Sequence, residues 1–418
     1  MKCSTDRILT THAGSLPRPA VLTQAIVGHD RGTLGPDEAG ALPTQIRDAV
    51  ATIAKSQAEA GVDIINDGEA SKIGYSTYVR ERLSGFSGKG RGLTIWDLHD
   101  VPEFAQRSLA GLDPQTTACT GPIVYQGRAA LEEDIVNLRT ATEELAPTEL
   151  FMTAASPGVI SIYLENQYYP TDKEYWEAIA EAMRLEYEAI VAAGFVLQLD
   201  APDLAMGRHV NTRLLDLDEF RRQVAVRVEL LNHACRNIPS DRIRLHLCWG
   251  NYHGPHHHDV PLGDLIDIFL RTKAMALSFE AANPRHQHEW RIWEDVALPD
   301  DKILIPGVID TCTSYVEHPE LVAERIGRFA GLVGRDRVIA GTDCGFANFA
   351  SYQIVDPKIA WMKLAALSEG ADLASRHLWN AGRTHERSAG RNGKSAALEA
   401  QHASHRYPVT YTQEEFLK

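Results

Sequence analysis

The sequence has 418 residues, 44% hydrophobic and 23% charged, a balance typical of a soluble globular enzyme with one large domain or two smaller ones. Its formal net charge of −14 argues against a general nucleic-acid binder, because phosphate contacts need clustered Lys and Arg. No apolar run approaches the roughly 20 residues of a membrane-spanning helix, and the N-terminus lacks the apolar core of a signal peptide. We therefore expect a cytoplasmic protein with no nucleic-acid or membrane partner.

Short apolar or β-branched runs recur along the chain, and helical patterns follow most of them. The predicted strands are 8–12, 62–66, 149–153, 195–199, 242–247, 275–279, 303–308 and 337–340. The predicted amphipathic helices are 43–60, 173–193, 217–237, 262–273 and 319–332. Alternating strands and helices imply parallel strands joined by crossover helices. The α/β pattern with eight such units favours a (β/α)8 TIM barrel over an open doubly wound sheet, for which we find no glycine-rich dinucleotide loop.

Two segments lie outside this alternation. Residues 70–148 form a long insertion after the second strand, which we expect to cap the barrel mouth or to make an oligomer contact. The expected division is a catalytic barrel at 1–383, which includes this insertion, and a polar C-terminal extension at 384–418. Docking of that tail on a partner subunit would make the protein a homo-oligomer, which the sequence leaves open.

Polar or metal-ligand residues follow nearly every predicted strand. In a barrel of this type the catalytic groups lie at the carboxyl ends of the strands. In chain order these residues are Gly14, Ser15, Glu69, Asp200, His246, Cys248, Glu280, Asp310, Cys312 and Cys344. Such a concentration of functional groups at strand ends predicts an active site at this end of the barrel.

His246 and Cys248 are two positions apart, so their side chains point to the same side of a strand. Facing inward they can bind one metal ion, and Glu280 and Cys344 would complete a tetrahedral set. One imidazole, two thiolates and one carboxylate favour Zn²⁺ over Mg²⁺ or Ca²⁺, which prefer oxygen ligands. Spacing alone leaves open that His246 is a core histidine and Cys248 a packing residue.

A histidine-rich segment competes with this set as a metal site. It contains His253, His256, His257 and His258. Because these residues lie close together on one loop, the pattern favours a solvated or lid segment. Glu69 and Asp200 are expected either to cap helices or to bind a substrate ammonium group at the barrel mouth.

Taken together, the segments resemble the catalytic barrel of cobalamin-independent methionine synthase. The matching segments, in that family's order, are TTHAGSLPRP, GVDIINDGEASK, LQLDAPDLAMG, HLCWGN, SFEAAN and GTDCGF. The zinc ligands implied by the resemblance are His246, Cys248, Glu280 and Cys344. The homocysteine-binding positions it implies are Gly14, Ser15, Glu69 and Asp200. A second, N-terminal barrel of the family's synthases has no counterpart in this sequence.

The sequence departs from the family pattern at the folate end. Ala201 replaces a glutamate, and Ala347, Asn348 and Phe349 replace basic residues after the last zinc cysteine. Cys312 aligns with a histidine that assists protonation, and Tyr163 aligns with a tryptophan that stacks on folate. The candidate catalytic residues are therefore Asp310, Cys312 and Tyr163. The same departures are typical of epoxyalkane:coenzyme M transferases, which combine the same zinc with another electrophile.

The resemblance implies a zinc-dependent enzyme that transfers a methyl or other alkyl group to a small-molecule thiol. Its alkyl donor would be methyltetrahydrofolate or another methyl donor. Three alternatives remain: thiol addition to an epoxide, a zinc hydrolase or lyase that uses metal-bound water, and a non-catalytic metal- or thiol-binding subunit. Thiolate-rich coordination argues against the hydrolase, because it makes zinc a poorer Lewis acid.

Overall fold

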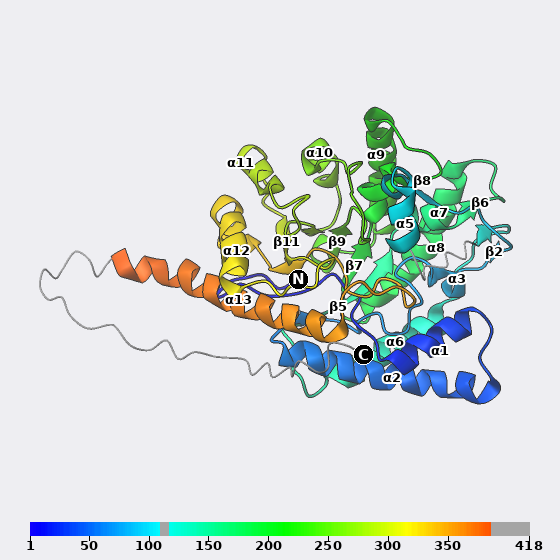
Figure 1. Ribbon diagram of the computed structural model, residues 1–418, viewed down its shortest axis with the longest axis horizontal. Helices are drawn as coiled ribbons and strands as arrows, with labels where there is room; N and C mark the ends of the chain where they lie inside the picture. Colours follow the sequence, from blue (N-terminus) through cyan, green and yellow to red (C-terminus); the bar gives the residue numbers. More distant parts are fainter. Residues whose placement is uncertain (109–116, 386–418) are drawn as a thin grey trace, which may run out of the picture. The chain divides into compact units, whose positions relative to one another are not determined.

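The computed structural model describes residues 1–108 and 117–385, with side chains up to residue 379 (Figure 1). Of the expected C-terminal extension, residues 386–418 lie outside the described part. The central element is a seven-stranded parallel sheet. In spatial order its strands are β1 (Ile64–Ile65), β5 (Glu149–Ala155), β7 (Val196–Asp200), β9 (Ile243–Leu247), β10 (Ala276–Phe279), β11 (Ile303–Ile309) and β12 (Gly341–Thr342).

Residues 9–11 connect the two edges of this sheet. Thr11 N–H donates to Ala340 O at 2.9 Å, beside a parallel bridge between Thr10 and Ala340. On the other side, Ile64 N–H donates to Thr10 O at 3.0 Å. The first predicted strand therefore lies between β1 and the segment that leads into β12, and the sheet curls until both of its edges reach it.

Helices surround the sheet in Figure 1, where α1, α2 and α6 pack beside one another. The longer helices are α1 (Ala20–Asp30), α2 (Pro36–Glu59), α6 (Arg128–Thr142), α8 (Asp172–Ala192), α9 (Leu217–Ala234), α12 (Pro319–Val333) and α13 (Pro357–His385). At the start of α8, Glu174 N–H donates to the Thr171 hydroxyl at 3.2 Å, which satisfies an otherwise unpaired amide. No helix in the described part of the chain is long and apolar enough to cross a membrane.

Two predicted elements differ in the structure. The predicted helix 262–273 is divided into η4 (Leu262–Asp264) and α10 (Ile266–Phe269), because Leu265 leaves helical geometry at φ −125°. The last predicted strand begins as the turn η6 (Arg335–Arg337), and β12 starts only at Gly341. The observed strand β12 therefore lies after the predicted strand 337–340 in the sequence.

The insertion contains short elements that reach over the carboxyl ends of the strands. They are α3 (Val79–Arg82), β2 (Phe86–Ser87), β3 (Thr94–Ile95), α4 (Trp96–His99), α5 (Pro102–Ser108) and β4 (Ala118–Cys119). The strand β3 pairs antiparallel with β8 (Val210–Asn211), and β4 pairs with β6 (Glu165–Asn166). The remaining elements are α7 (Pro157–Tyr163), α11 (Ile292–Asp295), η1 (Pro202–Leu204), η2 (Met206–Arg208), η3 (Ser240–Arg242) and η5 (Glu289–Arg291). The insertion is therefore tied to the loops that follow β5 and β7.

A buried cation crosses the interior of the curled sheet. Arg244 on β9 donates through Nη1 to the Thr11 hydroxyl at 2.9 Å and through Nη2 to His12 O at 2.6 Å. Its guanidinium lies 4.0 Å from the ring centroid of Phe151, so the charge is also stabilised by an aromatic face. Because β9 lies opposite residues 9–11 in the strand order, Arg244 holds the closing segment against the far side of the sheet.

Replacing Arg244 with methionine is expected to lower the free energy of unfolding by about 3 kcal/mol, because two charged hydrogen bonds are lost and buried acceptors are left unpaired. Urea denaturation followed by circular dichroism measures this difference. Arg47→Met on the exposed face of α2 is the control and should change stability by less than about 0.5 kcal/mol. Equal effects of the two substitutions would contradict the role of Arg244.

Candidate metal centre and active site

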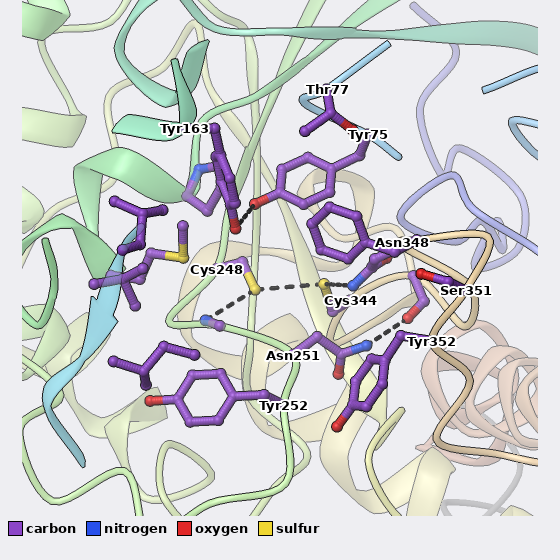
Figure 2. A pocket seen from close by; sticks show the side chains of 18 of the residues that line it. Tyr75, Thr77, Tyr163, Cys248, Asn251, Tyr252, Cys344, Asn348, Ser351 and Tyr352 are labelled. Carbon is purple, nitrogen blue, oxygen red and sulfur yellow. Dashed lines mark hydrogen bonds between the residues drawn. The ribbon is translucent and has the colours of Figure 1, made fainter. Parts of the chain in front are cut away.

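Three of the predicted metal ligands meet at the carboxyl ends of the strands. His246 lies on β9, Cys248 directly follows that strand, and Cys344 follows β12 by two residues. The sulfur atoms of the two cysteines are 3.4 Å apart (Figure 2), and one ligand atom from each of the three residues lies within 4.8 Å of the others. All three side chains are buried. The curled sheet therefore brings together residues that are up to 98 positions apart, from 246 to 344.

The surroundings favour negative charge on this sulfur pair. Gly250 N–H donates to Cys248 Sγ at 3.2 Å, and Asn348 Nδ2 donates to Cys344 Sγ at 3.5 Å. A hydrogen bond from the Cys248 thiol lowers the pKa of Cys344 to about 5 and raises the pKa of Cys248 well above its usual value. Neither ring nitrogen of His246 has a hydrogen-bond partner among the described residues. An anionic sulfur pair beside a bare buried imidazole is the donor set that suits a soft divalent cation.

Glu280 directly follows β10 but is held by other partners. Its carboxylate accepts from Trp249 N–H at 2.8 Å, Asn283 Nδ2 at 2.7 Å and Arg285 Nη2 at 2.6 Å. Burial raises the pKa of Glu280, but the positive charges of Arg285 and His286 outweigh it and leave the pKa below its usual value. The group whose ligand atoms lie within 4.8 Å of one another consists of His246, Cys248 and Cys344 and does not include Glu280. The role of Glu280 as a fourth ligand stays a prediction.

Two buried carboxylates face the same space, and Asp200 accepts a hydrogen bond from Gln198 Nε2 at 2.7 Å. Glu69 has a left-handed φ of 57°, and its Oε1 accepts from the Thr153 hydroxyl at 2.9 Å. Its Oε2 is buried with no hydrogen-bond partner among the described residues. Burial raises the pKa of Asp200 to about 7, and the negative charge of Glu69 adds to this shift. A strained acid with a free oxygen beside a second acid is an arrangement that a bound cation would stabilise.

Gly14 and Ser15 lie next to Glu69 and to the loop after β12. Gly14 has a φ of +126°, and an added Cβ would lie 2.6 Å from Thr153 Cγ2 and 2.8 Å from Glu69 Oε1. The Ser15 hydroxyl donates to Asn348 Oδ1 at 2.6 Å, which links this segment to the loop after β12. The absence of a side chain at position 14 is thus what allows Glu69 to sit against the strand ends.

The ligand group and the acids line one large cavity of about 930 Å³. Its wall includes residues of the insertion, among them Leu93, Ile95 and Leu98. Figure 2 shows Tyr75 and Tyr163 pointing toward each other beside the cysteine pair, with the Tyr75 hydroxyl donating to that of Tyr163 at 3.1 Å. Two tyrosine side chains therefore cover part of the space next to the sulfurs.

The other two candidate catalytic residues lie behind the cavity wall. The carboxylate of Asp310 accepts from Cys312 N–H at 2.7 Å within its own loop. The Cys312 thiol donates to Asn251 Oδ1 at 2.8 Å, and burial raises its pKa well above the usual value. Neither residue lines the cavity, and their catalytic roles remain predictions.

The structure adds residues to the candidate site that are not among the predicted site residues. Tyr75 lies in the insertion, where no periodic pattern identifies an inward-facing position. Asn251 lines the cavity and donates to Gly345 O at 2.8 Å. Asp343 accepts from the backbone N–H groups of Ala281 and Ala282, both at 2.8 Å, and so joins the loops after β10 and β12. Asp343 directly precedes Cys344 and belongs to the strand-end residues that the sequence indicates, and Asn251 could have been noticed because it follows HLCWG.

The histidine-rich segment does not behave as one unit. His253 and His257 are exposed, whereas His256 is buried. The expectation of a solvated segment is therefore wrong for His256, whose Nδ1 lies 3.2 Å from the Asp259 carboxylate.

Comparison with known proteins places this geometry in a family. Residues 117–367 match the family described as cobalamin-independent synthase, catalytic domain. The methionine synthase of Sulfolobus acidocaldarius is 25% identical over 376 residues, which cover 90% of this chain and 94% of that protein. The methionine synthase of Thermococcus kodakarensis is 24% identical, with 90% and 96% covered. The family resemblance of the sequence is thus confirmed.

A solved structure shares the fold. It is a B12-independent methionine synthase from Shewanella sp. W3-18-1, solved in complex with selenomethionine. The TM-score is 0.69 at 20% identity, with 89% of this chain and 99% of that chain covered. The curled parallel sheet is therefore consistent with the TIM-barrel fold expected from the sequence.

Gly14→Ala is expected to destabilise the protein by at least about 2 kcal/mol, because the backbone conformation is strained for alanine and the new Cβ meets Thr153 and Glu69. The matched control is Gly331→Ala on α12, where an added Cβ meets no atom within 4 Å. This control should gain about 0.5–1 kcal/mol, since alanine is the better helix former. Thermal or urea unfolding measures both, and a stable Gly14→Ala variant would contradict the packing described here.

Proposed function

The chain belongs to the cobalamin-independent synthase catalytic-domain family, and we propose that it transfers a methyl group to the thiol of homocysteine, with Zn²⁺ as its metal. One observation carries the proposal: the bare imidazole of His246 and the Cys248–Cys344 pair line the same cavity as Glu69 and Asp200. A thiol-activating donor set and an amine-binding acid pair are the two features that such an acceptor needs. The names of the archaeal relatives support the same assignment.

The donor set fits zinc. His246, Cys248 and Cys344 would hold the ion, and Glu280 is our candidate for the fourth ligand in exchange for its present partners. Bound zinc lowers the pKa of a thiol, which is ordinarily near 8.5, so that the sulfur is a thiolate at neutral pH. The amide donors of Gly250 and Asn348 limit the charge that builds up on the cysteine sulfurs.

The acids would bind the ammonium group of the acceptor. Glu69 Oε2 has no partner among the described residues, and the pKa of Asp200 is raised to about 7 by burial and by Glu69. A cation between the two would remove that repulsion and bring the pKa of Asp200 down again. Ser15 and the backbone at Gly14 lie beside these acids and would position the amino-acid end of the acceptor.

The aromatic residues would shape the space for the alkyl donor. Tyr75, Tyr163 and Phe349 contact one another, with ring centroids 5.5–6.1 Å apart. Burial raises the pKa of Tyr163 to about 12, so its hydroxyl is neutral and adds no charge near the sulfurs. Water exclusion and in-line placement of a methyl donor of the folate kind can together supply several kcal/mol of barrier reduction, of the order of 7 or more in the best intramolecular cases.

A second candidate function is thiol addition to an apolar electrophile such as an epoxide. The specific observation is that Phe349 and Ala347, rather than basic residues, line or border the cavity after Cys344. This apolar part of the wall would bind a small alkyl electrophile, and the arginines that line the cavity, Arg31 and Arg80, come from other segments. The zinc hydrolase alternative gains no such support.

The finer features of the fold are also our inference. We interpret residues 8–12 as the eighth strand, so that the sheet is a complete (β/α)8 barrel. The division into a barrel at 1–383 with its insertion and an extension at 384–418 stays a prediction, as does a homo-oligomer.

Zinc content tests the metal ligands. The double variant Cys248→Ser/Cys344→Ser is expected to lose the thiolate-bound zinc, because a serine hydroxyl is a poor ligand for this ion. Co²⁺-loaded protein offers a direct readout, since sulfur-to-cobalt charge-transfer absorption should be present in the wild type and absent in the double variant. Charge-transfer bands that survive in the double variant would contradict the assignment.

Acceptor binding tests the acid pair. Glu69→Gln or Asp200→Asn should weaken homocysteine binding at least about 30-fold in calorimetric titration, because one partner of a buried charge pair is lost. The zinc content should remain that of the wild type. Glu177→Gln on the exposed face of α8 is the control and should bind normally. Failure of the wild type to bind homocysteine, with another thiol bound instead, would favour the second candidate function.

A further inference from the structure

A second cluster of metal-ligand side chains lies apart from the cysteine pair. Its members are Asp97, His209, His256 and Asp259. One ligand atom from each of the four residues lies within 4.8 Å of the others. None of the four lines the large cavity, so the cluster is separate from the proposed active site.

The fold brings these residues together from three segments. Asp97 lies on α4 of the insertion, directly after β3, and His209 directly precedes β8. The antiparallel pairing of β3 with β8, together with Trp96 N–H donating to His209 O at 2.9 Å, places the two side by side. The other two residues come from the loop after β9.

The imidazole of His209 is fully buried, and neither of its ring nitrogens has a hydrogen-bond partner among the described residues. Its Nε2 lies 3.5 Å from Asp97 Oδ2 and 3.5 Å from Asp259 Oδ1. A buried polar group without a partner costs about 1–3 kcal/mol, so a ligand that joins these three residues would stabilise the fold.

The spacing of the donor atoms agrees with a tetrahedral ion. Zinc–nitrogen and zinc–oxygen bonds of about 2.0–2.1 Å require donor atoms about 3.3–3.4 Å apart. Besides the two contacts of His209, His256 Nδ1 lies 3.2 Å from Asp259 Oδ1. Three of the six edges of the donor tetrahedron, at 3.5, 3.5 and 3.2 Å, are therefore close to this length.

The outer partners of the ligands are also in place. The Tyr252 hydroxyl donates to Asp97 Oδ2 at 2.6 Å, and His256 Nε2 donates to Tyr252 O at 3.1 Å. The other oxygen of Asp259 accepts from His286 Nε2 at 3.0 Å and Arg285 Nη1 at 3.2 Å. Hydrogen bonds of this kind fix the orientation of ligating histidines and carboxylates in metalloproteins.

We propose that Asp97, His209, His256 and Asp259 form a second, structural site for a divalent transition-metal ion of the zinc class. Two carboxylates balance the charge of the ion, and four protein ligands in a buried position leave no coordination place open for chemistry. The ion would fasten the insertion to the loops after β7 and β9. The proposal goes beyond the proposed methyl transfer and does not depend on it.

Metal stoichiometry of the full chain, loaded with Zn²⁺ and freed of excess by gel filtration, tests the site. We expect two equivalents in the wild type and one in Cys248→Ser/Cys344→Ser. His209→Gln should also retain one equivalent, and the triple variant none. One equivalent in the wild type that disappears in the cysteine variant would overturn the second site and leave the proposed function intact. Wild-type protein with one equivalent of zinc that survives in the cysteine variant and disappears in His209→Gln would support the second site and contradict the zinc ligands of the proposed function.

Cobalt loading distinguishes the two sites by their spectra. The second equivalent of Co²⁺ should add visible ligand-field bands without sulfur-to-metal charge transfer, because the cluster contains no sulfur. His253→Gln, an exposed neighbour on the same loop, should leave these bands unchanged. Another possible set of metal ligands, Asp97, His257 and His258, lies nearby and is more exposed. Loss of the ligand-field bands in His257→Gln but not in His209→Gln would overturn our choice of ligands.

A stability measurement covers the case in which His209→Gln fails to fold. In the cysteine double variant, where the four cluster residues are intact, added Zn²⁺ should raise the melting temperature and a chelator should reverse the shift. Asp259→Asn in that background should remove the shift. An unchanged melting temperature in the cysteine variant would contradict the proposal.

Discussion

Closure of the parallel sheet is the constraint on which the candidate site depends. Cys248 follows β9 and Cys344 follows β12, and these strands are three places apart in the sheet. In a flat sheet their ends would be separated by about 14 Å, since neighbouring strands lie about 4.8 Å apart. The sulfurs are instead 3.4 Å apart, because residues 9–11 bond to both edges and force the sheet to curl. The cysteine pair is therefore a product of the whole curled sheet and not of any local motif.

Much of this arrangement could be predicted from the sequence, because two features of parallel strands are visible there: apolar runs, and functional residues at the carboxyl ends of the strands. Apolar runs identified the strands, and the strand-end rule identified His246, Cys248 and Cys344 as residues that converge. The rest depends on contacts with no periodic pattern. The pairing of β3 with β8 involves two residues on each side, too few for alternation to be visible. Asp97, which follows β3, therefore could not be recognised. Tyr75 lies in a segment without a periodic pattern, and the partners of Glu280 come from loops, so neither could be foreseen.

The charges around the two clusters are shared rather than separate. Arg285 donates to Glu280 beside the cysteine pair and also to Asp259 of the second cluster. One guanidinium thus compensates an acid next to the cysteine pair and an acid of the second cluster, in a protein whose net charge is −14. A change in the charge of either group would be felt by the other through this residue, because burial weakens the screening between them.

The short pairing of β3 with β8 has a consequence for motion. A ladder of two residue pairs contributes little by itself, and the pairing of β4 with β6 and side chains such as Asp97 and Tyr252 also attach the insertion. Segments with few backbone bonds open with a smaller free energy than the domain as a whole. The β3–β8 ladder is therefore expected to open more readily than the longer ladders of β5, β7 and β9 in the central sheet.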